Sequence, residues 1–224
     1  LNAVSGLASL INEEKDAAWV DIKSRWNNDD PTGWEWINNG KDFLWVSEKD
    51  GWRHIYSINL ATKKETLLTS GNYDMIGFGA IDQANGYVYF TASPNNALQQ
   101  YLYRVSLKGD GKAELISPAD LKGTHSYQIS PTGVFARHSF SNISTMPTDE
   151  WVNLTNGTVI KAGTKRSANE KSNAKFIQIT TEDAVTMDGW MVLPNNFDSA
   201  KKYPVVFYVY TEPGATTVSD TYGN

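Results

Sequence analysis

A pattern that returns every 46 to 48 residues constrains the fold of this chain more than any other feature of its sequence. Three glycine-containing turns, each followed by an apolar run, are spaced by 46 and 47 residues, at Gly40, Gly86 and Gly133. A set of aromatic residues keeps the same period, with spacings of 47 and 48 residues: Tyr56, Tyr103 and Trp151. Repeats of about 40 to 50 residues with about four strands each are typical of the blades of a β-propeller.

The repeat predicts an all-β fold with three consecutive four-stranded antiparallel blades within residues 34–160. Their predicted limits are Trp34 to Leu68, Asp74 to Ile116 and His125 to Ile160. An irregular β-sandwich with coincidental spacing is the alternative, but it does not explain why the aromatic residues recur in step with the turns. Three blades do not close a ring, which usually takes about four to eight. We therefore expect either further blades upstream or an open stack with unpaired edge strands.

The first repeat contains an aromatic hairpin, FLWVSEKDGWRHIY, from Phe43 to Tyr56. Asp50 and Gly51 form its predicted turn, because glycine readily adopts a positive φ, and the runs on either side read as strands. An isolated hairpin is marginal in water, so this one needs neighbouring strands. Residues 1–33 are less regular. We interpret them as the end of a preceding blade and a loop, with a strand or a short helix from Val4 to Ile11.

The composition excludes several classes of protein. With 40% hydrophobic and 20% charged residues among 224, the chain is a folded protein and not a disordered one. A net charge of −5 without a basic stripe argues against nucleic-acid binding. The absence of cysteine excludes disulfides, thiol catalysis and thiolate zinc sites. No motif predicts a metal or another cofactor. The longest apolar run, six residues from Val205 to Tyr210, is too short to span a membrane.

The pattern changes after the third repeat. Residues 161–174 are polar and charged without an apolar period, which predicts a linker. Beyond it, extended runs are predicted at Phe176 to Thr180, Trp190 to Leu193 and Val205 to Tyr210. The last run is apolar on both faces, as in a strand buried within a sheet. We therefore expect a second domain to begin in residues 175–224. The start without methionine suggests an internal piece of a longer protein.

The sequence offers few candidate catalytic residues. No serine lies in a G-x-S-x-G motif, and the spacing of His54, His125 and His138 does not suggest metal ligation. We expect each histidine to be a half-buried hydrogen-bonding residue. Tyr210 is the exception, because it lies where the predicted buried strand gives way to a Pro-Gly loop. In open α/β sheets active sites lie at that edge, and a phenol there can donate a hydrogen bond to a developing oxyanion. A surface tyrosine in a turn is the alternative.

Two stretches resemble the dipeptidyl peptidase IV family, in particular its bacterial branch: SEKDGWRHIY with the blade that follows it, and DGWMVLPNNFDSAKKYPVVFYVYTEPG. YLYRVSLKGDGK and Gly123-Thr124-His125 are similar to that family too, in the same order along the chain. The resemblance implies late propeller blades followed by the first strands of an α/β-hydrolase domain. It also implies a periplasmic or extracellular serine exopeptidase, with a homodimeric parent protein. Its substrates would be peptides with proline or alanine at the second position, from which it removes N-terminal dipeptides.

The resemblance assigns one catalytic residue to this chain. In the VYxxP pattern of the family the tyrosine contributes its hydroxyl to the oxyanion hole, and Tyr210 in VYTEP matches it. Thr211 departs from the glycine or alanine that is common at this position in relatives. The Ser-Asp-His triad would lie beyond Asn224, and the glutamates that bind the substrate's amino terminus would lie before Leu1, so we expect this chain to be inactive alone. The alternatives are a non-enzymatic propeller that binds peptides or glycans, and another oligopeptidase of the clan, such as an acylaminoacyl peptidase.

Overall fold

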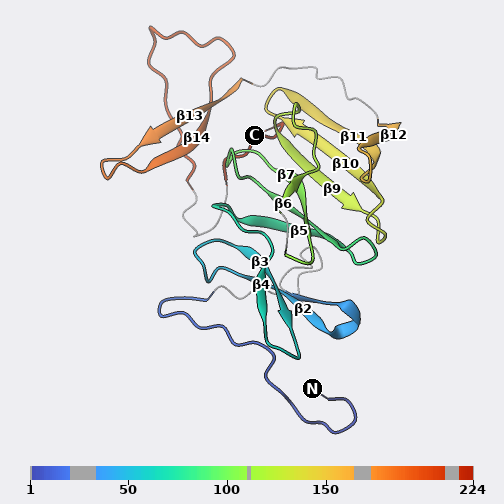
Figure 1. Cartoon of the computed structure of the whole chain (residues 1–224). Helices are drawn as coiled ribbons and strands as arrows, with labels where there is room; N and C mark the ends of the chain where they lie inside the picture. Colours follow the sequence, from blue (N-terminus) through green and yellow to red (C-terminus); the bar gives the residue numbers. More distant parts are fainter. Residues whose placement is uncertain (1, 21–33, 110–111, 164–172, 210–216, 224) are drawn as a thin grey trace. The chain divides into compact units, whose positions relative to one another are not determined.

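The computed structural model describes residues 2–20, 34–109, 112–163, 173–209 and 217–223. Apart from one short 3-10 helix, η1 (Asn38–Gly40), the regular elements of these residues are β-strands. They form three four-stranded sheets and one two-stranded sheet (Figure 1). The three consecutive four-stranded meanders that the repeat predicts are therefore confirmed.

Each four-stranded sheet is built from strands that follow one another in the sequence. The first contains β1 (Trp34–Ile37), β2 (Asp42–Ser47), β3 (His54–Asn59) and β4 (Glu65–Leu67). The second contains β5 (Met75–Asp82), β6 (Tyr87–Ala92), β7 (Tyr101–Ser106) and β8 (Glu114–Leu115). The third contains β9 (Thr124–Ile129), β10 (Phe135–Asn142), β11 (Thr145–Asn153) and β12 (Thr158–Ala162). A separate antiparallel hairpin consists of β13 (Ala174–Thr180) and β14 (Thr186–Val192).

The three turn glycines occupy equivalent positions, each between the first and second strands of its sheet. Their φ angles are 75° at Gly40, 77° at Gly86 and 69° at Gly133. A side chain with a Cβ strains the backbone at such angles, whereas glycine adopts them freely. The periodic glycines therefore mark one recurring turn geometry.

The repeat extends to the residue that follows each third strand, which is a leucine in all three sheets. Its backbone N–H donates to a carbonyl at the turn before the second strand. These bonds are Leu60 to Lys41 (3.0 Å), Leu107 to Gly86 (2.9 Å) and Leu154 to Val134 (2.8 Å). The aromatic landmarks Tyr56, Tyr103 and Trp151 lie on the third strands themselves.

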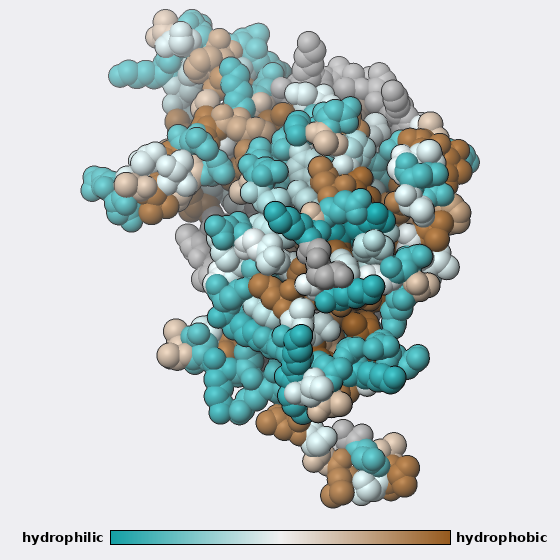
Figure 2. Space-filling model, in the orientation of Figure 1, coloured by the Kyte–Doolittle hydropathy of each residue, from teal (hydrophilic) through white to brown (hydrophobic). Residues whose placement is uncertain are grey.

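The core lies mainly on the two inner strands of the first and second sheets. Leu44 and Ile55 are buried on β2 and β3, and Phe90 and Leu102 are buried on β6 and β7. The outer strands β4 and β8 contain no buried residue. Large apolar side chains are also exposed elsewhere, and Figure 2 shows brown patches between hydrophilic side chains on the face in view.

Contacts between residues divide the chain into two compact units. The first contains residues 1–94, 103–115 and 131–133, and the second contains residues 95–102, 116–130 and 134–224. β1 to β6 therefore belong to the first unit and the β13–β14 hairpin to the second, whereas β7 is divided between the two. No helix of the described residues is long and apolar enough to cross a membrane.

Two expectations for the ends of the chain are wrong. Residues 205–209 are not in a strand, and the side chains of this run are exposed, with Val206 at 94% and Phe207 at 85%. An apolar run is buried only where neighbouring strands cover it, and none of the described strands pairs with this one. Val4 to Ile11 form neither a strand nor a helix. The predicted linker overlaps strands at both its ends, because β12 reaches Ala162 and β13 begins at Ala174.

Candidate functional site

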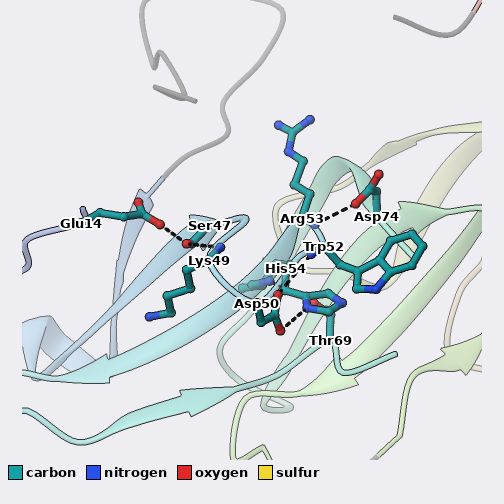
Figure 3. Close-up of polar contacts among 10 residues, drawn as sticks. Glu14, Ser47, Lys49, Asp50, Trp52, Arg53, His54, Thr69 and Asp74 are labelled. Carbon is teal, nitrogen blue, oxygen red and sulfur yellow. Dashed lines mark hydrogen bonds and ion pairs between the residues drawn. The ribbon is translucent and has the colours of Figure 1, made fainter. Parts of the chain in front are cut away.

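The first cluster of polar side chains surrounds the hairpin between β2 and β3 (Figure 3). Asp50 and Gly51 turn the chain, and Gly51 has a φ of 96°. Nδ1 of His54 donates to Oδ2 of Asp50 over 2.9 Å, which ties the turn to the start of β3. Burial opposes ionisation of Asp50, yet the hydrogen bond from His54 helps to hold the pKa of this carboxyl below its ordinary value. The predicted Asp-Gly turn is confirmed.

The remaining acidic groups of this cluster also have donors. Glu14 accepts from Nε1 of Trp45 over 2.9 Å and from the hydroxyl of Ser47, so it holds the N-terminal segment against β2. Asp74 accepts from the backbone N–H of Arg53 over 2.7 Å. These hydrogen bonds connect the N-terminal segment and the residue before β5 to the hairpin, which supports a structural role for the SEKDGWRHIY stretch.

A second cluster lies in the third sheet and contains two histidines in direct contact. Nδ1 of His125 lies 2.8 Å from Nε2 of His138, and the two rings are nearly parallel. Nε2 of His125 lies 2.9 Å from the carbonyl oxygen of Leu121, and Nδ1 of His138 lies 2.9 Å from Oε1 of Glu150. Both histidines are buried, with 0% and 2% of their surfaces exposed.

The protonation of the two imidazole rings decides which of these three contacts are hydrogen bonds. A carbonyl and a carboxylate only accept, so Nε2 of His125 and Nδ1 of His138 carry protons. With both imidazoles neutral, the inner contact between the two rings then has no proton. Burial lowers the pKa of His125 to about 4 and also lowers the pKa of His138, against the opposing effect of Glu150. Acidification therefore supplies the proton that completes the inner contact, at the cost of a buried charge.

Aromatic rings surround the two histidines. The ring of Tyr127 stacks on His138 with 4.4 Å between centroids, while Tyr101 and Phe140 lie 5.0 and 4.9 Å from His125. Burial raises the pKa of Tyr127 to about 12, so its hydroxyl stays protonated at neutral pH. Because both imidazole rings are buried, this cluster is suited to stabilising the sheet.

The structure tests only some of the predicted site residues. Tyr210 lies outside the described residues. The three histidines do form hydrogen bonds, but the expectation that they are half-buried is wrong, because none of them is more than 2% exposed. Sequence reasoning also missed Glu150. It lies directly opposite His138 in the β10–β11 register, so a hairpin alignment of the third repeat could have paired the two. Among the described residues, no three histidine or acidic side chains form a group that could hold a metal ion.

Three successive four-stranded meanders of common period define the chain as part of a β-propeller. The sequence profile of the dipeptidyl peptidase IV (DPP IV) N-terminal region matches residues 2–147. The chain therefore belongs to the dipeptidyl peptidase IV family, and the matched residues are those of its N-terminal propeller region.

Individual relatives agree with this assignment. The chain is 24% identical over 194 residues to dipeptidyl peptidase 4 of Trichophyton equinum, and 25% identical to that of Trichophyton tonsurans. Each match covers 83% of this chain and 25% of the relative, so the chain spans about a quarter of their length. The crystal structure of Porphyromonas gingivalis dipeptidyl peptidase 4 shares the fold. Its TM-score is 0.78 at 24% identity, over 93% of this chain and 29% of that one.

Proposed function

We propose that this chain is part of a serine peptidase of the bacterial branch that removes N-terminal dipeptides from peptides with proline or alanine at the second position. In this proposal residues 34–160 form late propeller blades, which gate and position the peptide. Residues 175–224 then begin an α/β-hydrolase domain. The protein acts in the periplasm or outside the cell, as a homodimer, and without a cofactor.

One observation carries the proposal: the order of features along a single chain. Three blades of dipeptidyl peptidase IV type are followed by the β13–β14 hairpin, which ends in the DGWMVLP stretch, and then by VYTEP. A propeller that only binds peptides or glycans explains the blades but has no need of the two later stretches.

The proposal gives Tyr210 a catalytic role. Its phenol donates a hydrogen bond to the oxyanion of the tetrahedral intermediate, where charge develops during acyl transfer. Such a bond is made mainly in the transition state, so its loss lowers kcat more than it raises KM.

Steady-state kinetics of the intact protein on a Gly-Pro chromogenic substrate test this role. Tyr210→Phe is expected to lower kcat by about 10²- to 10³-fold, as for other single oxyanion donors. Tyr208→Phe is the matched control, because it removes the same hydroxyl two residues earlier, and its kcat is expected to stay within about twofold of the unmodified protein. A Tyr210→Phe enzyme as active as this control would leave Tyr210 without a catalytic role.

Two further results test the assignment to peptidases as a class. The isolated chain is expected to release nothing from the same substrate, since it lacks the nucleophile, the base and the amine-binding carboxylates. The gene of the intact protein is expected to encode a G-x-S-x-G motif within about 100 residues after Asn224. An open reading frame without that motif would favour a propeller that only binds peptides or glycans.

A further inference from the structure

Asp220 is 8% exposed and hydrogen-bonded through both its backbone and its carboxylate. Its backbone N–H donates to the carbonyl of Leu98 over 2.6 Å, and its own carbonyl accepts from the hydroxyl of Thr124 over 2.9 Å. Oδ2 accepts from Nε2 of Gln99 and Oδ1 accepts from the backbone N–H of Ile143, both over 2.9 Å. We call these four hydrogen bonds and the residues that form them the Asp220 junction. Because Asp220 is buried and bonded through both its backbone and its side chain, the junction holds the residue in one position.

The partners of Asp220 come from three separate places in the chain. Gln99 lies in the loop before β7 and is 121 residues away, Thr124 begins β9 and is 96 residues away, and Ile143 lies in the β10–β11 turn and is 77 residues away. All belong to the same compact unit as Asp220. The junction therefore holds the segment of residues 217–223 against the third sheet and the loop before β7.

The chemistry of the junction is specific for a carboxylate. Two N–H donors, one from a side chain and one from the backbone, point at its two oxygens. The orientation of the Gln99 amide is set from its other side, because its Oε1 accepts from the hydroxyl of Tyr101 over 2.7 Å. An asparagine at position 220 has one acceptor oxygen and one NH2 group, so its NH2 group would face either Nε2 of Gln99 or the backbone N–H of Ile143, and two donors would then meet. The bond from Tyr101 to Oε1 of Gln99 opposes a turn of the Gln99 amide that would relieve this contact.

We propose that Asp220 is a positioning residue, which anchors residues 217–223 to the third sheet and so fixes the chain downstream of the VYTEP stretch. Its effect on catalysis rests on the role proposed for Tyr210, which precedes it by ten residues. A displacement of about 1 Å at a catalytic group can cost about 10²-fold in rate, so the anchor of a neighbouring segment influences kcat. Asp220 itself acts through the chain and does not touch the substrate.

An exchange of charge between the two partners tests the anchor in the intact protein. Gln99→Glu places two carboxylates in contact, and Asp220→Asn places two donors in contact. Each is expected to raise amide hydrogen exchange in residues 217–223 by about tenfold, the equivalent of one hydrogen bond to a charged group. The double variant carries a donor at 220 and an acceptor at 99, and is expected to return exchange to within about threefold of the unmodified protein.

The chain offers a matched control for these variants. Gln178 donates to Asp188 over 3.1 Å across the β13–β14 hairpin, a pair of the same residue types in an exposed position. Gln178→Glu and Asp188→Asn are expected to leave exchange in residues 217–223 unchanged. The anchor would be overturned if exchange in residues 217–223 were the same in Gln99→Glu, Asp220→Asn and the control variants. It would also be overturned if the double variant exchanged as fast as the two single variants.

Activity of the same variants separates the anchor from the proposed function. Gln99→Glu and Asp220→Asn are expected to lower kcat about tenfold with a smaller change in KM, and the double variant is expected to recover. If exchange rises but kcat does not change, while Tyr210→Phe is impaired, the positioning role is overturned. If Tyr210→Phe is as active as its control, the catalytic role proposed for Tyr210 fails, and the exchange data still decide whether Asp220 anchors the segment.

Discussion

Two stretches of this protein have nearly the same composition and opposite environments. β6 reads YVYFTA, and residues 205–209 read VVFYV, so both combine valine with aromatic residues. On β6 Val88 and Phe90 have no exposed surface. In the other stretch Val206 is 94% exposed and Phe207 is 85% exposed.

The difference lies in the neighbours of each stretch. β6 lies between β5 and β7 in the second sheet, which pair its backbone on both sides, and four of its six side chains are buried. Residues 205–209 have no paired strand among the described residues. A preference for β structure is realised only where other strands provide a pleated, half-buried surface. The repeats supply this surface from adjacent sequence, whereas no described strand supplies it to residues 205–209.

Truncation of Phe90 on β6 is expected to lower the stability of the protein far more than truncation of Phe207 in residues 205–209. Phe90→Ala is expected to lower the free energy of unfolding by about 3–5 kcal/mol, because it leaves a cavity in a packed core. Phe207→Ala in the same chain is expected to change it by no more than about 0.5 kcal/mol, since this side chain already contacts solvent. Urea denaturation of both variants measures the difference. Equal losses would mean that residues 205–209 are buried in solution.

The stability of the third sheet is expected to depend on pH more strongly than that of the β13–β14 hairpin. The pKa of His125 is lowered to about 4, so between its ordinary value of 6.5 and pH 4 the unfolded chain binds a proton that the folded chain does not. Stability is therefore expected to fall as the pH drops from about 6.5 to about 4, by up to about 1.4 kcal/mol per pH unit for each such proton.

Amide exchange locates this loss of stability. Protection is expected to decrease in β9, β10 and β11 on acidification, with a smaller change in β13 and β14. His125→Gln removes the titrating ring and is expected to flatten the pH dependence of unfolding. An unchanged slope in this variant would mean that other groups cause the acid sensitivity.

Replacing a glycine by alanine is expected to cost more stability in the repeats than in the β13–β14 hairpin. Gly133 has a φ of 69°, and a Cβ at this position would lie 2.8 Å from Cβ of Asp82. Gly133→Ala is therefore expected to cost about 1–2 kcal/mol or more. Gly189 on β14 has no positive φ, and a Cβ there would meet the side chain of Ile177 at 3.1 Å. Gly189→Ala is expected to change stability by less than about 0.5 kcal/mol in thermal or urea unfolding.

The smallest expected effect concerns a hydroxyl of β6. Tyr89 donates to the carbonyl of Gly133 over 3.4 Å and is buried, so Tyr89→Phe is expected to cost about 0.5–1.5 kcal/mol. Tyr208→Phe, in the exposed stretch, is expected to leave the unfolding midpoint unchanged. A cost at Tyr208 as large as that at Tyr89 would contradict the exposure of this stretch.

Much of the fold could be predicted from local sequence. The equal spacing of Gly40, Gly86 and Gly133 predicted one turn geometry, because a positive φ favours glycine whatever the surroundings. The Asp50-Gly51 turn could be predicted for the same reason. The candidate site was less predictable, because the contact of His125 with His138 and the burial of Asp220 join residues from different strands and loops.

By itself, the sequence determined the turns and the all-β class, since these follow from residue types that act within a few positions of one another. It also determined the period, which is the equal spacing of those turns. Only the tertiary structure decided which strands are covered. It buried β6, left the similar residues 205–209 exposed, enclosed the three histidines completely and placed Asp220 among donors 77 to 121 residues away. The physical reason is that burial and the pairing of polar groups depend on neighbours in space, and a local pattern does not specify them.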